Sequence, residues 1–240
     1  MDKTWDWFQS LLEQKGLPVS PEQLEQFERY YELLVEWNEK MNLTGITEKD
    51  AVYEKHFFDS VSLAFYVDPA KINSLADIGS GAGFPSVPLK IMFPHLKVTI
   101  VDSLNKRITF LKHLSEQLKL KDVHCVHGRA EDIARLPEHR DSYDVVTARA
   151  VARLNVLNEF CLPFVKQGGL FAAMKGAKSD EEVAEAAASF RLLKGKVVAQ
   201  HELKLPFEQS ERHIILVSKL DRTPRAYPRK AGTPLKQPIV

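Results

Sequence analysis

The sequence predicts an α/β fold in which a mostly parallel sheet of seven strands has an antiparallel last strand and a helical N-terminal extension. From residue 75 onward, short β-rich runs alternate with amphipathic segments, a rhythm typical of βαβ units with right-handed crossovers. Two further strand-like runs, 196–205 and 212–220, have no helical pattern between them, so they should pair antiparallel. The first 70 residues carry helical periodicity instead.

The N-terminal extension begins its main helix at a clear start signal. Ser20 supplies a cap side chain, Pro21 occupies the first helical position, and Gln23 follows three residues after the cap. Apolar residues then recur every three to four positions and give the helix one apolar face: Leu24, Phe27, Tyr31, Leu34 and Trp37 or Met41. We expect a second helix through 51–67, which Pro69 ends.

Five runs predict the parallel strands, and three segments predict the helices between them. The strand candidates are LADIG, KVTIVD, VHCVHG, YDVVTAR and LFAAMK, at 75–79, 97–102, 123–128, 143–149 and 170–175. The helical candidates cover 86–93, 105–119 and 155–165. A chain of 240 residues can bury a sizeable core. The expected organisation is a helical segment 1–70 packed on a core domain 71–220, followed by an arm 221–240.

The arm differs in composition from the rest of the chain. Its four prolines and five basic residues, against a single acid, predict an extended or mobile segment. The whole chain, in contrast, has 33 basic and 32 acidic residues and a formal net charge of +1. Any affinity for nucleic acid must therefore come from a local patch of cations.

The sequence indicates neither a membrane segment nor a metal site. No apolar run approaches the length that a membrane span needs, so we expect a cytoplasmic protein. The two cysteines, Cys125 and Cys161, lie in separate apolar surroundings, and no Cys or His spacing suits zinc. This pattern favours two reduced core thiols over a disulfide or a metal site.

The run at 75–79 leads directly into a glycine-rich loop, DIGSGAGFP. A ligand can lie against bare backbone there, because three residues lack a Cβ and allow a positive φ: Gly79, Gly81 and Gly83. Two ligand classes compete, a dinucleotide with its G-x-G-x-x-G loop and an adenosyl group with a looser G-x-G-x-G loop. Phe84 breaks the dinucleotide pattern, and Pro85 removes an N–H that a pyrophosphate would use. The loop therefore favours S-adenosylmethionine, whose sulfonium tolerates the nearby acid Asp77.

Polar residues follow the next three strands at the same expected edge, where ligands of open parallel sheets bind. Asp102 can accept from both hydroxyls of a ribose, although an acid that caps the following helix would have the same spacing. Ala130 offers an apolar contact to an adenine, and Glu131 or Asp132 can either accept from its exocyclic amine or cap a helix. Arg149 fits a structural ion pair and a ligand contact equally well.

With these motifs the chain resembles the RsmG family, also called GidB, whose members are bacterial 16S rRNA guanine-N7 methyltransferases. The resemblance covers nearly the whole chain and rests on motifs in this order: WNEKMNLTGIT, HFFDS, DIGSGAGFPSVPL, DSLNKRITFL, RAE, ARA, MKG and ERH. It implies a class I methyltransferase fold, which is Rossmann-like, with 71–220 as the domain that binds S-adenosylmethionine. The arm lies beyond the compact core of the family.

The resemblance also implies which residues contact the cofactor and which reaction follows. The implied S-adenosylmethionine contacts are Gly79, Phe84, Ala130, Glu131 and Arg149, to which the pattern of the strand ends adds Asp77, Gly81 and Asp102. The implied reaction is methylation of N7 of one guanine near the decoding region. Because N7 carries a free lone pair, the enzyme has to align the reactants and needs no general base. We therefore expect His56 to pair with Asp59 or a backbone group.

Binding of 16S rRNA, free or within the small ribosomal subunit, requires phosphate-binding cations. The candidates are Lys106, Arg107, Lys175 and Lys178 near the expected site, and Arg222, Arg225, Arg229 and Lys230 in the arm. Two alternatives stay open from the residues alone: an NAD-dependent Rossmann oxidoreductase, and a non-catalytic RNA-binding factor for ribosome assembly. The sequence predicts no particular oligomeric state.

Overall fold

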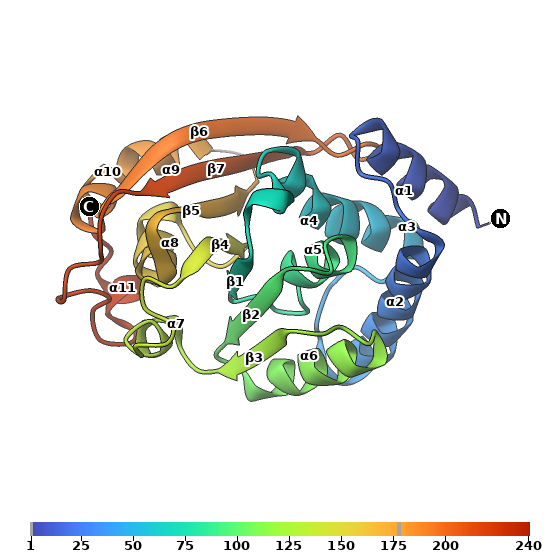
Figure 1. Ribbon diagram of the computed structural model, residues 1–240, viewed down its shortest axis with the longest axis horizontal. Helices are drawn as coiled ribbons and strands as arrows, with labels where there is room; N and C mark the ends of the chain where they lie inside the picture. Colours follow the sequence, from blue (N-terminus) through green and yellow to red (C-terminus); the bar gives the residue numbers. More distant parts are fainter. Residues whose placement is uncertain (1, 177–178) are drawn as a thin grey trace.

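The computed structural model describes residues 2–176 and 179–240, and within them the chain forms a seven-stranded sheet with helices on both faces (Figure 1). The strand order is β3-β2-β1-β4-β5-β7-β6. Strands β1 to β5 run parallel, and β7 pairs antiparallel with both β5 and β6. The bounds are β1 Ser74–Ile78, β2 Lys97–Asp102, β3 Val123–His127, β4 Tyr143–Arg149, β5 Val165–Lys175, β6 Gly195–Lys204 and β7 Glu211–Lys219. The predicted mostly parallel sheet with an antiparallel last strand is confirmed.

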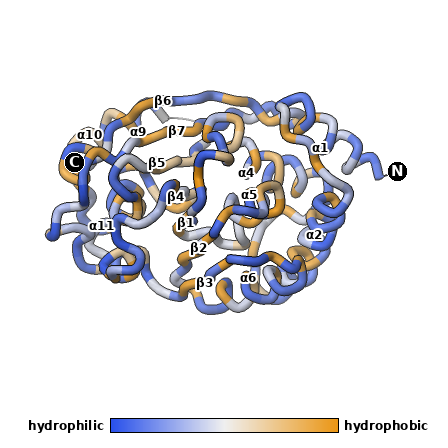
Figure 2. The backbone as a smooth tube through the Cα atoms, in the orientation of Figure 1, coloured by the Kyte–Doolittle hydropathy of each residue, from blue (hydrophilic) through white to orange (hydrophobic). Residues whose placement is uncertain are grey.

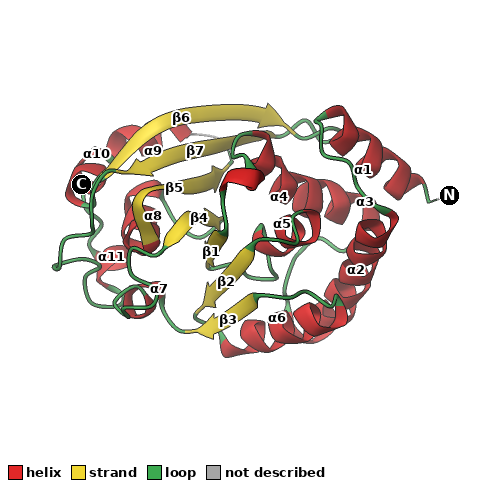
Figure 3. Cartoon of the chain, viewed as in Figure 1, coloured by secondary structure: helices red, strands yellow, loops and turns green. Residues whose placement is uncertain are grey.

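Helices form the N-terminal extension and the two layers beside the sheet (Figure 3). The extension contains α1 Lys3–Gln14, α2 Pro21–Met41, α3 Lys49–Val52, the π-helical turn η1 Tyr53–Phe58, α4 Asp59–Val61, and the 3-10 turns η2 Ser62–Phe65 and η3 Pro69–Lys71. The later helices are α5 Ser86–Met92, α6 Asn105–Gln117, α7 Ala130–Ile133, α8 Leu154–Cys161, η4 Leu162–Phe164, α9 Ser179–Glu185, α10 Ala187–Leu192 and α11 Thr233–Lys236. Of the helices in the described ranges, none combines the length and the apolar run that crossing a bilayer takes.

Helix α2 starts at the residues that the sequence indicates. The Ser20 hydroxyl accepts from the Gln23 N–H at 3.2 Å, and the Gln23 side chain accepts from the Ser20 N–H at 2.8 Å. The buried face is rotated from the predicted one, because Tyr30 is fully buried whereas Tyr31 is partly exposed. The Tyr30 hydroxyl donates to the Ala82 carbonyl at 2.7 Å. This bond fastens α2 to the glycine loop.

The second predicted helix, 51–67, is helical but irregular, since it passes from α3 through the π-helical turn η1 into α4 and η2. The turn buries Tyr53 and Phe57 in the core, whereas His56 is only partly buried. His56 stacks on Phe84 of the glycine loop, with ring centroids 4.5 Å apart. The extension is thus packed against the residues that follow β1.

Two clusters of buried apolar side chains hold the helices to the sheet. One cluster joins α1, α2, η1 and α6 and includes Phe27, Tyr53 and Phe110. The other joins α8, α10 and the end of the arm and includes Phe190 and Ile239. Figure 2 shows apolar and hydrophilic residues alternating along α2 and α6, which lets each helix bury one side and expose the other.

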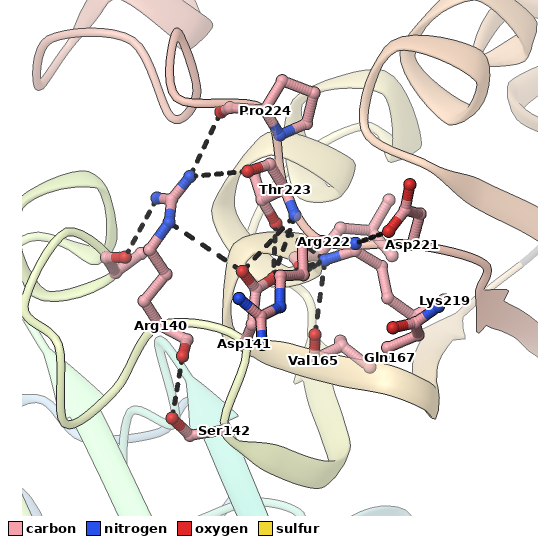
Figure 4. Close-up of polar contacts among 12 residues, drawn as sticks. Arg140, Asp141, Ser142, Val165, Gln167, Lys219, Asp221, Arg222, Thr223 and Pro224 are labelled. Atoms are coloured by element: carbon pink, nitrogen blue, oxygen red, sulfur yellow. Dashed lines mark hydrogen bonds and ion pairs between the residues drawn. The ribbon is translucent and has the colours of Figure 1, made fainter.

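The C-terminal arm, 221–240, packs along the core, so the expectation of a mobile segment is wrong. At its root, the buried ammonium of Lys219 donates to Asp141 Oδ1 at 2.9 Å and to Thr223 Oγ1 at 2.7 Å, and Arg140 donates to the Thr223 carbonyl at 2.9 Å (Figure 4). Near its end, Ile239 is 8% exposed. These individual partners hold a segment whose overall composition suggested mobility.

Candidate active site

The glycine loop follows β1 at the carboxyl edge of the sheet, with φ of +74° at Gly79, +64° at Gly81 and +107° at Gly83. The surroundings of the three glycines differ. A Cβ on Gly83 would lie 2.6 Å from the Tyr30 hydroxyl, whereas a Cβ on Gly79 would lie 2.9 Å from Cγ2 of Val151, just after β4. Beyond residues 80–82, no described heavy atom lies within 4 Å of the Cβ position at Gly81. Gly83 therefore serves the packing of α2, and Gly79 and Gly81 form the part of the loop that a ligand can approach.

Asp77, at the end of β1, lies beneath the loop. Its side chain is fully buried, and Oδ2 accepts from the Ser86 N–H at the start of α5, at 3.1 Å. Oδ1 has no hydrogen-bond partner among the described residues. Burial raises the pKa of this carboxyl to about 6. A fully buried carboxylate does not support the predicted direct contact with a ligand. Asp77 instead holds the loop against α5.

Asp102, at the end of β2, connects two parts of the site. It is 2% exposed; Oδ1 accepts from the Leu104 N–H at 2.9 Å and Oδ2 accepts from the Gly81 N–H at 3.2 Å. Arg107 Nη1 lies 3.4 Å from Oδ2. The carboxylate therefore caps the turn before α6, as one interpretation of the sequence had it, and it also fixes the glycine loop at the carboxyl edge of the sheet.

Ala130 and Glu131 follow β3 and begin α7. Glu131 is 4% exposed, and its Oε1 accepts from the Gly232 N–H of the arm at 2.7 Å. No local pattern in the sequence indicates this contact, because the two residues are far apart in the chain. Glu131 lies at the predicted edge, with one oxygen already engaged by the protein.

A cavity of about 410 Å³ opens between these strand ends, and we call it the β1–β3 cavity. Its lining includes Gly79 after β1, Ser103 and Leu104 after β2, and Ala130 and Glu131 after β3. Its opposite side is formed by apolar residues from three other segments: Val151, Phe160 and Leu235. Of the described residues that line it, Arg129 alone carries a positive charge. The cavity therefore suits a largely uncharged nucleoside better than a pyrophosphate.

A second cavity, of about 340 Å³, opens over the ends of β4 and β5 and the start of β7, and we call it the β4–β7 cavity. It is lined by charged and polar groups, among them Lys55, His56, Asp59, Arg149, Lys175 and Arg212. Ala150 lines this cavity and the next residue, Val151, lines the β1–β3 cavity. The two cavities are thus neighbours along one edge of the sheet.

Arg149 forms the structural ion pair that the sequence allowed, and its contact with a ligand stays a prediction. Its Nη1 donates to Asp59 Oδ2 at 2.7 Å and to the Lys55 carbonyl at 3.0 Å, so it forms a structural ion pair. Its guanidinium also lies over the Phe84 ring, 5.0 Å from the centroid, and lines the β4–β7 cavity. Arg212 of β7 approaches the other oxygen of Asp59, at 3.4 Å. One carboxylate therefore organises two arginines at this edge.

His56 contacts a backbone carbonyl, one of the two kinds of partner expected for it, and not Asp59. His56 Nε2 lies 2.8 Å from Thr44 Oγ1, and Nδ1 lies 3.2 Å from the Lys55 carbonyl and 3.3 Å from Arg149. Burial, reinforced by the positive charge of Arg149, lowers the pKa of His56 to about 3. The imidazole is therefore neutral at physiological pH, and the alternative expectation of a backbone contact is met.

The predicted RNA-binding cations fall into two groups. Lys175 donates to the Ala152 carbonyl at 2.8 Å and pairs with Glu182, and Arg229 pairs with Glu159, so both charges already have partners inside the protein. Arg107 also has an internal partner, Asp102, at 3.4 Å, and the exposed Lys106 donates to the Met41 carbonyl at 3.3 Å. The arm residues Arg222, Arg225 and Lys230 are exposed. Lys178 lies outside the described residues.

Sequence reasoning missed the contribution of β7. Arg212 and His213 line the β4–β7 cavity because an antiparallel strand presents its first residues at the edge where parallel strands present their last. The signal was available in the ERH motif, which falls at the start of this strand. Lys55 and Leu235 were missed as well, and no local pattern distinguishes either of them.

Solved structures with similar folds include methyltransferases. TYW2 of M. jannaschii in complex with AdoMet has a TM-score of 0.54 and 17% identity, covering 70% of this chain and 76% of that one. A predicted O-methyltransferase from Agrobacterium tumefaciens has a TM-score of 0.55 and 16% identity, covering 69% and 82%. At such identities the similarity concerns the fold alone, which is that of a class I, Rossmann-like methyltransferase.

Similarity in sequence is much closer and spans nearly the whole chain. Curated proteins named ribosomal RNA small subunit methyltransferase G, from Bacillus licheniformis and from a strain of Bacillus cereus, are each 60% identical over 232 residues, which is 97% of this chain and 97% of each relative. The family model described as GidB, rRNA small subunit methyltransferase G, matches residues 23–215. This chain belongs to the GidB family of rRNA small subunit methyltransferases G.

Proposed function

We propose that this protein transfers a methyl group from S-adenosylmethionine to N7 of one guanine in 16S rRNA, near the decoding region. Family membership and the names of the relatives support the substrate class. The observation that carries the proposal is the pair of neighbouring cavities at one edge of the sheet, with Ala150 lining one and Val151 the other. The β1–β3 cavity fits a nucleoside cofactor, and the β4–β7 cavity fits a polar base. The location that follows for such an enzyme is the cytoplasm.

The β1–β3 cavity has the groups that an adenosyl ligand needs. Gly79 leaves the loop backbone bare, and Ala130 with Glu131 supplies an apolar surface and an acceptor. Asp102, between the lining residues Val101 and Ser103, fixes the loop through the Gly81 N–H. Bound there, S-adenosylmethionine supplies a methyl group on a positively charged sulfur. The residues of the chain have to bind this ligand, orient it and keep water away from the reacting atoms.

The β4–β7 cavity supports a guanine as the second substrate. Guanine offers acceptors at O6 and N7 and donors at its amino group. The arginines Arg149 and Arg212 can donate to an acceptor such as O6, and Asp59, which lines the same cavity, pairs with both of them. A cavity rich in donors favours guanine, with acceptors at O6 and N7, over adenine, which carries an amine in place of O6.

His56 positions the site and does not take up a proton in this proposal. Its pKa of about 3 keeps it neutral, and its ring stacks on Phe84 while Nε2 contacts Thr44. Guanine N7 has a lone pair at neutral pH, so alignment of the reactants is sufficient. The same reasoning accounts for a site rich in positioning contacts around Arg149 and Asp59.

The test is methyl transfer to 16S rRNA with methyl-labelled S-adenosylmethionine, followed by mass spectrometric mapping of the product. Naked 16S rRNA and small ribosomal subunits, both from cells lacking the gene, serve as parallel substrates. We expect one 7-methylguanosine, and its absence from both substrates overturns the proposal. Calorimetry with S-adenosylhomocysteine and with NADH separates it from an oxidoreductase, since only the former should bind.

A further inference from the structure

One side of the β1–β3 cavity is formed by the C-terminal arm. Leu235 of α11 lines the cavity, although this apolar side chain is otherwise 59% exposed. Three residues earlier, the Gly232 N–H donates to Glu131 Oε1 at 2.7 Å, with Gly232 at a φ of +84°. The arm therefore contacts the cavity through an apolar side chain and through a backbone donor.

The arm is attached directly beside this cavity. Arg229 donates from its backbone N–H to Glu159 Oε1 at 2.6 Å and from Nη2 to Glu159 Oε2 at 2.7 Å, and Glu159 is 1% exposed. Phe160, the next residue of α8, lines the cavity. Arg229 Nη2 also donates to the Gln237 carbonyl at 2.8 Å, which draws the two ends of 229–237 together.

Three further attachments fix the course of the arm. Its root is held by the contacts of Lys219 with Asp141 and Thr223 (Figure 4), and its end is held by the burial of Ile239. Arg135 donates to the Pro228 carbonyl between these points. The attachments on both sides of the segment 229–237 therefore hold it beside the β1–β3 cavity, which Leu235 lines.

We propose that residues 229–237 are part of the cofactor site, where Leu235 covers the nucleoside and Gly232 fixes the carboxylate of Glu131. This inference rests on the proposed function. The Gly232 N–H holds one oxygen of Glu131 and leaves the other for the exocyclic amine of an adenine. A nucleoside in the cavity removes apolar surface of Leu235 from water, which strengthens binding without any change in the core.

The first measurement is calorimetric titration with S-adenosylhomocysteine of the full-length protein, the L235A variant and the L220A control. Leu220 is 54% exposed, lies just before the arm and does not line the cavity, so L220A removes the same atoms elsewhere. We expect L235A to raise Kd by about fivefold, a partial loss of buried aliphatic groups, and L220A to leave it within about twofold. Thermal melts should coincide, because both side chains are mostly exposed.

The second measurement repeats the titration with methylthioadenosine, which keeps the nucleoside and lacks the amino-acid portion. The same loss for L235A is expected, since Leu235 is assigned to the nucleoside end. If the unmodified protein binds neither ligand, the proposed function fails. If it binds both and L235A matches L220A, the inference about the arm is wrong while the proposed function stands. A loss seen only with S-adenosylhomocysteine overturns the assignment to the nucleoside.

Discussion

Gly79 and Val151 face each other so closely that a Cβ on Gly79 would lie 2.9 Å from Cγ2 of Val151. Gly79 directly follows β1, and Val151 follows β4. These two strands are neighbours in the sheet, and between them the order in which strands are added changes direction. Ligands of open α/β sheets bind at this switch point. The contact therefore marks the border between the two cavities.

The substitution Gly79→Val should abolish binding of S-adenosylhomocysteine, because the new side chain competes with Val151 and with the ligand for the same space. Gly16→Val is a matched control: Gly16 has a φ of +75°, and no described atom lies within 4 Å of its Cβ position. Both variants place a side chain at a positive φ, but only Gly79→Val also displaces Val151, so Gly79→Val should lower the melting temperature more than Gly16→Val does. Loss of binding in both would trace the effect to strain and remove the loop from the site.

Asp102→Asn should weaken binding of S-adenosylhomocysteine by about 1–3 kcal/mol, the cost of losing hydrogen bonds to a charged acceptor. Asp144→Asn is the control, since Asp144 accepts from Asn73 and Ser74 at the opposite edge of the sheet, at 2.9 and 2.8 Å. It should lower stability and leave affinity unchanged. Calorimetry and denaturation of both variants decide the matter, and an unaltered Kd for Asp102→Asn would leave this residue only its cap of the turn before α6.

Asp59→Ala should lower the free energy of unfolding by about 3–5 kcal/mol, because it leaves the guanidiniums of Arg149 and Arg212 without their carboxylate partner. The carboxylate is 5% exposed and lies 2.7 Å from Arg149 Nη1. Glu185→Ala, which removes the exposed partner of Arg153, should cost about 0–1 kcal/mol. Urea denaturation measures both, and equal costs would show that burial of the Asp59 pair is energetically unimportant.

His56 makes the stability of the fold depend on pH. Burial lowers its pKa from 6.5 to about 3 in the folded chain, so between these values the unfolded chain binds a proton that the native chain does not. Stability from this group is therefore lost as pH falls below 6.5. Between pH 7 and 5 the wild type should lose about 2 kcal/mol more than His56→Gln.

Asp77 gives the stability a pH dependence of the opposite sign. Because the wild type and His56→Gln both contain Asp77, this contribution cancels when the two are compared. Its raised pKa of about 6 means that the native chain holds the extra proton, so its contribution declines as pH rises from 3.8 through 6. His124→Gln, on an exposed residue of β3, controls for loss of an imidazole. Parallel stability curves for the wild type and His56→Gln would contradict the assignment.

Exposed cations of the arm should contribute to RNA binding by neutralising phosphates. The double variant Arg225→Ala/Lys230→Ala should make the slope of log affinity against log salt shallower by about 0.7–0.9 for each phosphate that the protein no longer neutralises. Lys71→Ala/Lys97→Ala removes the same charge at the opposite edge of the sheet and should leave the slope unchanged. Binding of 16S rRNA at several salt concentrations gives the slopes, and identical slopes for the two double variants would return this role to Lys106.

Most of the sheet could be predicted because each strand carries its own local signal. The run at 143–149 coincides with β4, and the run at 97–102 coincides with β2. Strand β5 begins five residues before its predicted start, since Gly168 and Gly169 look like a turn in the sequence. In the sheet they accommodate an irregular pairing, and a Cβ on Gly169 would lie 2.7 Å from the Asp144 carbonyl. Such a close approach depends on a strand that is distant in sequence.

The candidate site was predictable where residues follow strands and unpredictable where it depends on long-range contacts. Positions such as Asp102 and Arg149 could be found because strand ends converge at one edge. The partner of Glu131, Gly232, could not be found, because nothing local relates them. For the arm, the amino-acid composition indicates only the average behaviour of such segments. The ion pair between Arg229 and Glu159 and the burial of Ile239 are individual long-range contacts, which composition does not reveal. The contacts assigned to the cofactor stay predictions.

The place of β7 between β5 and β6 has a consequence for a chain emerging from the ribosome. Strand β6 is synthesised first, yet its only neighbour among the described strands is β7, which comes later. The parallel strands β1 to β5 can assemble beforehand, but β5 then presents a free edge and β6 has nothing to pair with. A chain that stops before Glu211 therefore leaves β6 and one edge of β5 unpaired, the type of surface that promotes aggregation. Completion of one late strand pairs β5 and β6 at once and leaves β6 as the outer strand of the sheet.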